Sequence, residues 1–195
     1  CIAKDQGDGG AIYIEGLNAT VENSLFNITQ STTGRGGAIY IEGEGANILN
    51  STFSRSNSTS GGTIYIEGDD THIIDCDMSF SSSNIVPNAT GFGCGGALFV
   101  AGNNAVISST FRFTNGTGGP DKPGSGGAIY VAGNNTIITE STFFTTIAKN
   151  GGDGGAIYIA GTNATVKDSY FDTTQSALGR GGAIYVNGYN ANVLN

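Results

Sequence analysis

Apolar and polar residues alternate over short stretches of this chain, as they do in β-strands with one buried face. In residues 9–16, GGAIYIEG, Ile12 and Ile14 share one side of an extended chain, while Tyr13 and Glu15 share the other. A glutamate is not expected on the dry side of a strand. The pattern therefore predicts a short strand whose isoleucines point into a core and whose tyrosine points outward.

Two more short strands are predicted directly after residues 9–16. The residues after 17 alternate again, which places Val21 inward and predicts a corner at Asn23. The segment after this corner predicts a third strand with inward positions Ser24, Phe26 and Ile28. One copy of the pattern thus predicts three strands, two tight corners and one variable corner.

The eight-residue stretch returns six more times with small changes, at spacings of 27, 25, 34, 31, 28 and 27 residues. Repeats of this length are typical of solenoids, in which each unit needs its neighbours to bury its apolar face. Abundant β-branched residues and the lack of a 3.6-residue period exclude helical repeats. We predict an all-β fold, a right-handed single-stranded parallel β-helix of about seven turns with 25–34 residues and three strands each.

Stacked turns place equivalent residues above one another, so the repeats predict columns of like side chains. An inward aromatic column contains Phe26, Phe53, Met78, Phe111, Phe143 and Phe171. An outward aromatic column contains Tyr13, Tyr40, Tyr65, Phe99, Tyr130, Tyr158 and Tyr185. A corner column contains Asn23, Asn50, Asp75, Ser108, Glu140, Asp168 and Asn195, although the turn that holds Ser108 is one residue short there.

A longer period is also present. Residues 1–50 match residues 146–195 at 33 of 50 positions, a shift of 145 residues or five turns. We therefore expect residues 1–195 to form one continuous segment of a longer array, because such a period suits a stalk or fibre better than an enzyme with one unrepeated site.

Composition narrows the possible partners. Only 12% of residues are charged and the net charge is −8, so the lysines and arginines that neutralise nucleic-acid phosphates are scarce. No apolar run is long enough to insert into a membrane. Possible N-glycosylation sites suit an extracellular surface, and they occur at Asn18, Asn27, Asn50, Asn57, Asn88, Asn115, Asn134 and Asn163.

The pairing of GGAIYI with a following NSLF (23–26) or NSTF (50–53) resembles two families of surface proteins. One is the adhesin-like proteins of methanogenic archaea. The other, more distant because its Phe-x-x-Asn element is mostly missing here, is the chlamydial polymorphic outer-membrane proteins. The resemblance implies an extracellular right-handed β-helix, displayed on a cell surface, that mediates attachment or forms a filament. It implies no catalytic residues.

β-Helices also include polysaccharide lyases and hydrolases, whose chemistry needs converging carboxylates. The richest candidate cluster is spread around a predicted turn and comprises Glu67, Asp69, Asp70, His72, Asp75 and Asp77. We therefore expect no catalytic site. A carbohydrate-active β-helix, either a lyase, a hydrolase or a phage-type spike, stays as the alternative.

Two outward columns have both a structural and a functional interpretation. Glu15, Glu42 and Glu67 stack on successive turns, where they are either solvated or able to recruit Ca²⁺, the only cofactor considered. The outward aromatic column either stabilises the sheet as a ladder or forms a contact face for sugars or a neighbouring fibre.

The remaining features concern the variable corner and the cysteines. The two long insertions, 81–94 and 114–125, contain all three prolines and are candidates for a binding loop. Cys76 is predicted to be a buried thiol that does not pair with Cys94, and the state of Cys1 and Cys94 is left open.

The leading hypothesis is a non-enzymatic, extracellular cell-surface protein, a segment of a β-helical adhesin, stalk or filament. Its expected partners are further copies of itself, end to end or side by side, and surface glycans or a partner cell.

Overall fold

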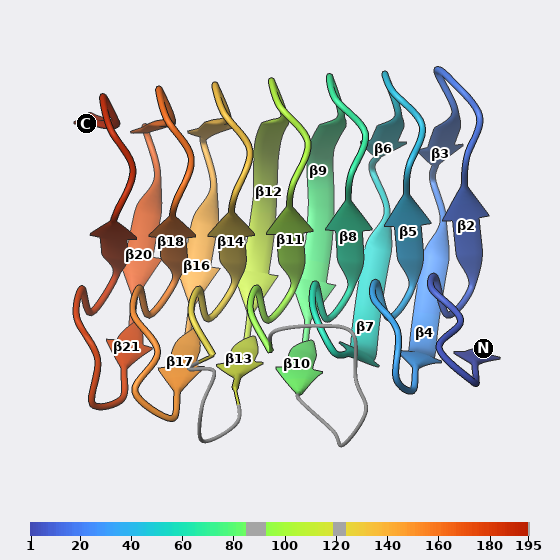
Figure 1. Ribbon diagram of the computed structural model, residues 1–195, viewed down its shortest axis with the longest axis horizontal. Helices are drawn as coiled ribbons and strands as arrows, with labels where there is room; N and C mark the ends of the chain where they lie inside the picture. Colours follow the sequence, from blue (N-terminus) through green and yellow to red (C-terminus); the bar gives the residue numbers. More distant parts are fainter. Residues whose placement is uncertain (85–92, 119–123, 195) are drawn as a thin grey trace.

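The computed structural model describes residues 1–84, 93–118 and 124–194, and it shows the predicted parallel β-solenoid (Figure 1). One sheet takes a single strand from every turn, in chain order, and all its pairs are parallel and in register. Its members are β2 (Ile12–Ile14), β5 (Ile39–Ile41), β8 (Ile64–Ile66), β11 (Leu98–Val100), β14 (Ile129–Val131), β18 (Ile157–Ile159) and β22 (Ile184–Val186).

The rest of each turn belongs to a second, 16-stranded sheet that wraps around the remaining sides. Over the first three turns its strands are β1 (Ile2–Ala3), β3 (Thr20–Glu22), β4 (Leu25–Ser31), β6 (Asn47–Leu49), β7 (Thr52–Ser58), β9 (His72–Ser79) and β10 (Ser82–Asn84). The later turns contain β12 (Val106–Arg112), β13 (Asn115–Thr117), β15 (Ile137–Thr139), β16 (Thr142–Phe144), β17 (Ile147–Lys149), β19 (Thr165–Lys167), β20 (Tyr170–Asp172), β21 (Gln175–Ser176) and β23 (Asn192–Leu194). The first four turns have three strands each, as predicted, whereas the fifth (β14 to β17) and the sixth (β18 to β21) have four.

The Gly-Gly pairs bend the chain into the first strand of each turn. The first glycine of every pair has a positive φ, for example 65° at Gly9 and 63° at Gly36, a conformation that costs glycine little. The second glycine lies against the next turn, where a Cβ on Gly37 would stand 2.2 Å from the Gly62 carbonyl oxygen. The backbone conformation therefore favours glycine at the first position, and the close contact between turns favours it at the second.

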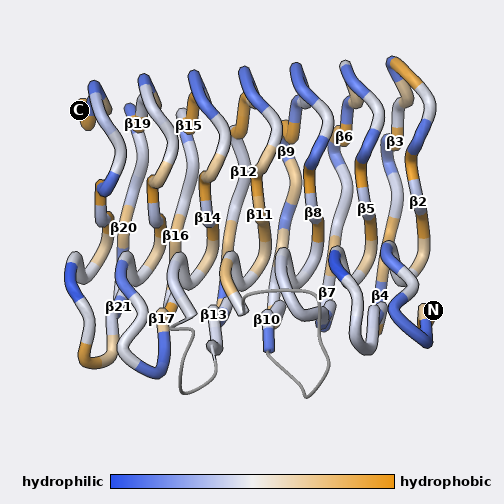
Figure 2. The backbone as a smooth tube through the Cα atoms, in the orientation of Figure 1, coloured by the Kyte–Doolittle hydropathy of each residue, from blue (hydrophilic) through white to orange (hydrophobic). Residues whose placement is uncertain are grey.

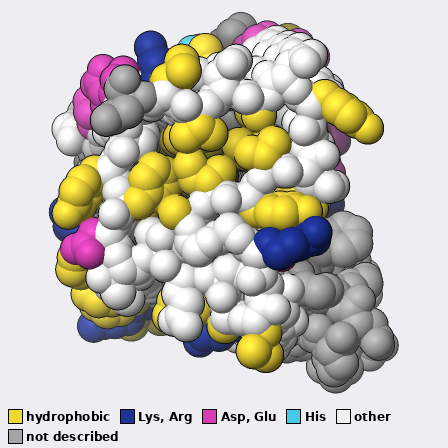
Figure 3. Space-filling model, turned by 90° about the vertical axis from the view of Figure 1, so that its left-hand side faces the viewer, with side chains coloured by type: hydrophobic (Ala, Val, Ile, Leu, Met, Phe, Trp, Pro, Cys, Tyr) yellow, Lys and Arg dark blue, Asp and Glu magenta, His cyan; other side chains and the backbone are white. Residues whose placement is uncertain are grey.

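The core lies inside the coil and is built from the predicted columns. Figure 2 shows hydrophobic residues along β2, β5 and β8, and the isoleucines of these strands point inward. Phe26 stacks on Phe53 with ring centroids 4.8 Å apart, and Phe143 stacks between Phe111 and Phe171 at 5.0 and 4.8 Å. In Figure 3, which faces the C-terminal turn, hydrophobic side chains gather in the middle of the coil.

One predicted core residue is on the surface instead. Ile28 is 60% exposed, because its backbone is left-handed (φ 53°) and turns the side chain outward. The same bend recurs in each of the first six turns, at Ile28, Arg55, Phe80, Phe113, Thr145 and Thr173. After the bend, the alternation of inward and outward side chains shifts by one residue. The core next to this segment is therefore lined with small polar groups, such as the Thr29 and Ser56 hydroxyls, which are 2.8 Å apart.

Over its described residues the chain forms strands, turns and bends but no helix. That same part of the chain accordingly holds no apolar helix of membrane-spanning length. Half of the residues of the two predicted binding loops, including all three prolines, lie outside the described residues.

Candidate functional site

The outward aromatic column forms an unbroken ladder of seven rings. Neighbouring ring centroids are 4.7–5.5 Å apart, and most pairs are nearly parallel. The rings point away from the main core, as predicted, but pointing outward does not make them exposed. Tyr40, Tyr65 and Phe99 are 2%, 7% and 6% exposed, because adjacent rings cover their faces, whereas Tyr13 is 51% exposed. The ladder is thus a second, external apolar cluster.

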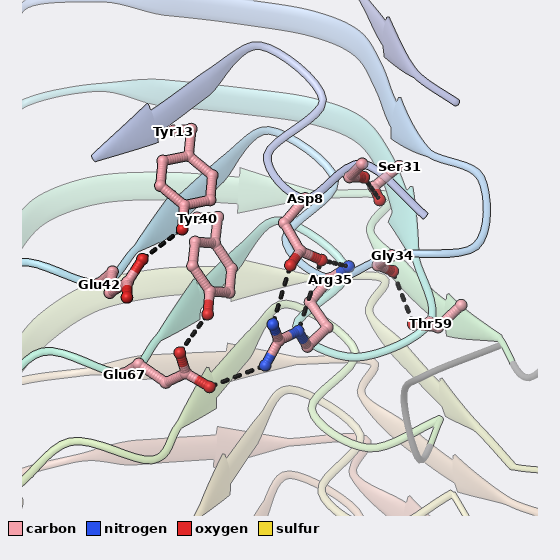
Figure 4. Close-up of polar contacts among 10 residues, drawn as sticks. Asp8, Tyr13, Ser31, Gly34, Arg35, Tyr40, Glu42, Thr59 and Glu67 are labelled. Carbon is pink, nitrogen blue, oxygen red and sulfur yellow. Dashed lines mark hydrogen bonds and ion pairs between the residues drawn. The ribbon is translucent and has the colours of Figure 1, made fainter. Parts of the chain in front are cut away.

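A clasp of charged groups covers one edge of this ladder (Figure 4). The Arg35 guanidinium lies 4.7 Å from the Tyr40 ring centroid and 4.8 Å from that of Tyr65. It donates to Asp8 Oδ2 at 2.8 Å and to Glu67 Oε1 at 2.7 Å. Glu67 also accepts a hydrogen bond from the Tyr40 hydroxyl. The Arg35 clasp, formed by these five residues, ties three successive turns together.

These contacts alter the acidity of the groups. Burial by itself lowers the pKa of Arg35, but the hydrogen bonds and charge of Asp8 outweigh it and hold the guanidinium protonated. Burial, followed by the hydrogen bond to Glu67, raises the pKa of Tyr40 well above its ordinary value. The hydrogen bond to Glu42 is the main reason why the pKa of Tyr13 rises to about 12. The phenols therefore act as hydrogen-bond donors at neutral pH.

The proposed calcium column is engaged by these donors. Glu42 accepts from Tyr13, and Glu67 accepts from Tyr40 and Arg35, while Glu15 is exposed in the first turn. In the part of the chain that the structure describes, no three His, Cys, Asp or Glu side chains group closely enough to hold a metal ion. Glu42 and Glu67 thus serve as hydrogen-bond acceptors for the tyrosines of the ladder.

Three of the five members of the clasp have counterparts in the later turns. Arg180 donates to Asp153 Oδ2 at 2.8 Å and lies 4.5 Å from the Tyr185 ring centroid, as Arg35 does with Asp8 and Tyr40. Burial would raise the pKa of Asp153, but the hydrogen bonds from Arg180 lower it. Arg35 and Arg180 are equivalent positions of the 145-residue period, and each makes the same contacts with an aspartate within the fold.

No family model, curated protein or solved structure matches this chain. Its functional interpretation therefore depends on its own geometry.

The fold separates the carboxylates of the candidate catalytic cluster between Glu67 and Asp77. Glu67 belongs to the clasp, and His72 is half-buried on β9. Asp69 and Asp70 begin two ladders at the first corner, where Asn103 and Asn104 donate their side-chain amides at 3.1 and 3.0 Å. The remaining two members, Asp75 and Asp77, lie together elsewhere on the surface.

The first-corner ladders run from Asp69 to Thr162 and from Asp70 to Asn163, at a different corner from the predicted corner column. Asn134 donates to Asn103 at 3.1 Å, and Asn135 donates to Asn104 at 3.0 Å, each one turn later. At the predicted corner, Asn50 donates its side-chain amide to Asn23 at 2.6 Å. In the sequence, this corner is marked by the Asn-Asn or Asp-Asp pair that follows the first strand of a turn, because asparagine in a left-handed conformation suits a tight corner.

A missing residue creates a notch near Asp75 and Asp77. The pairing of β12 with β9 shifts between Ser108 and Ser109, as the one-residue deficit predicts, so Asp75 has no partner in the next turn. Asp75 and Glu140 have left-handed backbones, with φ of 54° and 48°, and the turn between them lacks this corner residue. The resulting notch has a volume of about 270 Å³ and is lined by Asp75, Cys76, Asp77, Ser108, Ser109, Thr110 and Glu140.

The glycosylation candidates differ in accessibility. Asn18 and Asn27 are exposed, while Asn57 and Asn115 are half-buried within strands. The amide nitrogens of three others already donate in ladders, and these are Asn50, Asn134 and Asn163. Asn88 lies outside the described residues, as does Asn195 of the corner column.

Cys1, Cys76 and Cys94 all lie in the described part of the chain, and no disulfide joins any two of them. Cys76 is 2% exposed at the base of the notch, as predicted, and Cys1 is exposed. Cys94 is buried beside the aromatic ladder, where burial raises its pKa to about 11.

Proposed function

We propose that this chain is a segment of an extracellular, cell-surface β-helical adhesin, stalk or filament, and that its role is mechanical and not enzymatic. The main support is the recurrence of the aspartate–arginine pair of the clasp after 145 residues. Asp8 with Arg35 and Asp153 with Arg180 make the same contacts at the same 2.8 Å distance. A solenoid with a repeated higher-order unit gains length with each added unit, and length is what a stalk requires.

Imaging of chains with one, two and three copies of the 145-residue unit tests the mechanical role. Each unit adds five turns, so electron microscopy should show rods that lengthen by roughly 24 Å per copy at constant width. Compact particles whose length does not follow copy number would contradict the proposal. Sedimentation of the same chains separates end-to-end from side-by-side association, the two modes of self-assembly that we propose.

Surface location needs its own experiment. We expect antibodies against the folded chain to label intact cells of the source organism, and brief protease treatment of those cells to remove the signal. A signal that appears only after lysis would place the protein inside the cell and overturn the extracellular role.

A carbohydrate-active β-helix is the second candidate, and the notch favours it because Asp75 and Asp77 line one concave site. Incubation with acidic and neutral polysaccharides, followed by measurement of new reducing ends and of unsaturated products, tests this activity. If Asp77→Asn abolishes such release without loss of stability, the enzymatic role replaces the mechanical one.

A further inference from the structure

Three phenylalanines form an exposed aromatic platform on the flank of the solenoid. Phe80 and Phe113 stack with centroids 4.9 Å apart, and Phe144 meets Phe113 edge-on at 5.8 Å. They are 55%, 39% and 37% exposed, in contrast to the buried phenylalanines of the core column. Exposed apolar groups rimmed by polar ones are typical of contact and ligand-binding sites.

The platform is continuous with the notch. Arg112 precedes Phe113 and pairs in the sheet with Phe144, and its guanidinium donates to Asp77 Oδ2 at 2.6 Å. Asp77 in turn lines the notch, and its other carboxylate oxygen is buried with no hydrogen-bond donor. That oxygen is closed to solvent, but the Arg112 and Asp77 side chains as a whole are 48% and 36% exposed, so both are available to hydrogen-bond a ligand at the surface. Rings, guanidinium and notch therefore form one surface across β9, β12 and β16.

We propose that this surface binds a sugar chain of neutral or amino-bearing residues. The faces of sugar rings carry C–H groups that pack on aromatic rings, while their hydroxyls donate to carboxylates and accept from arginine. Three phenylalanines are a small area for a stable protein interface, which buries roughly 800 Å² per partner. One or two sugar rings match the platform better, with the next residue of the chain in the notch.

Charge selects the kind of sugar. The notch contains Asp75, Asp77 and Glu140, and Arg112 is the one cation that contacts them among the described residues. Acidic sugars such as uronates are repelled by this excess of negative charge, while hydroxyl or ammonium donors are attracted. This site would give the proposed stalk a binding specificity. The two proposals are independent, because a chain that binds no sugar can still have the mechanical role.

Isothermal titration of the 195-residue chain with defined tetramers tests the proposal. The probes are the tetramers of glucosamine, N-acetylglucosamine and glucose, with the galacturonic acid tetramer as the acidic comparison. We expect saturable binding of at least one of the first three and none of the fourth. If none of the first three binds at a few millimolar, or if the galacturonate tetramer binds best, the proposal is wrong.

Variants taken from the same column preserve the fold. Thr145 and Thr173 occupy the position of Phe80 and Phe113 in other turns, so Phe80→Thr with Phe113→Thr is compatible with the backbone. We expect this pair to weaken binding roughly tenfold or more. Ile28→Thr, in the same column but away from the platform, is the matched control and should leave binding unchanged. Equal binding by the control and the double variant would overturn the assignment.

Asp77→Asn tests the notch separately. It keeps the shape of the side chain but removes the charge, so glucosamine tetramer affinity should fall by about tenfold while the melting temperature changes little. An unchanged affinity would show that the notch is not part of the site. Calcium binding that competes with all sugars and is lost in Asp77→Asn would likewise overturn the proposal, because the notch would then be a cation site.

Discussion

Asp8 and Arg35 lie one turn apart, and the guanidinium NH2 of Arg35 stands 2.8 Å from Asp8 Oδ2 while the Asp8 Oδ1 atom accepts from the Arg35 backbone. The pair closes over the aromatic ladder, where Arg35 also contacts two tyrosine rings. An ion pair on an exposed surface contributes little to the stability of a fold, but this one packs against apolar rings and includes several hydrogen-bond donors. The clasp therefore couples neighbouring turns.

Replacement of Arg35 by alanine should lower the free energy of unfolding by about 1–3 kcal/mol, because Asp8 and Glu67 lose their donor and two rings lose their cover. Arg35→Lys should recover only part of this loss, since an ammonium cannot serve both carboxylates with a planar fork. Urea unfolding measures the difference. Arg180→Ala is the comparison, and because the Arg180 side chain is 71% exposed, we expect a smaller effect. Equal losses at the two positions would contradict the role of burial.

Two glycines of one column should respond differently to alanine. A Cβ on Gly43 would stand 2.1 Å from the Gly16 carbonyl oxygen, whereas no atom lies within 4 Å of a Cβ on Gly16. We expect Gly43→Ala to cost more than about 3 kcal/mol and Gly16→Ala to stay within about 0.5 kcal/mol. Thermal unfolding of both variants measures this. Similar melting temperatures would show that the turns can move apart.

The inward aromatic column should tolerate methionine but not alanine. Phe111 is fully buried between Met78 and Phe143, and Met78 already occupies the same column one turn earlier. Phe111→Ala leaves a cavity and should cost about 3–5 kcal/mol, while Phe111→Met should cost less than about 1.5 kcal/mol. Denaturant titration distinguishes the two. Equal costs would mean that ring stacking, and not filled volume, sets the stability of this column.

The first-corner ladder has a fixed hydrogen-bond direction, which a charge should disrupt. Asn103 donates to Asp69 and accepts from Asn134, so Asn103→Asp places two carboxylates together. We expect a loss of about 1–3 kcal/mol at neutral pH that diminishes in acid, as one carboxylate is protonated. Asn103→Thr, which copies Thr162 in the same column, is the uncharged control. If both variants unfold alike at every pH, repulsion plays no part.

Alkaline pH should weaken the fold through the tyrosine ladder. The Glu42 hydrogen bond raises the pKa of Tyr13, and burial raises that of Tyr130, both from 10 to about 12. Below pH 10 the phenols are protonated in both states, so this stability is fully present. Between pH 10 and 12 the unfolded chain releases protons that the folded chain retains, and stability falls as pH rises.

Urea unfolding across this pH range, with tyrosinate absorbance followed in parallel, measures the effect. Tyr130→Phe, which copies Phe99 in the same ladder, should make the decline less steep. An unchanged slope in this variant would assign the alkaline loss to other groups.

The sequence by itself determined the parallel coil and its columns. Side-chain alternation places Ile12 inside, and the repeat then places Ile39 above it, because equivalent residues of stacked turns must meet. The same argument fixed the Phe26 and Phe53 stack and the buried Cys76. It failed at Ile28, because a left-handed bend changes the parity of everything that follows and a non-glycine bend leaves no clear mark in the sequence.

Only the tertiary structure decided which columns touch across the surface. Alternation shows that Tyr40 points outward, but its burial depends on the rings above and below and on Arg35 folding over it. The notch is a similar case. The missing residue after Ser108 is visible in the sequence, but which side chains face the gap depends on the turns on either side, and those come together only when the chain coils.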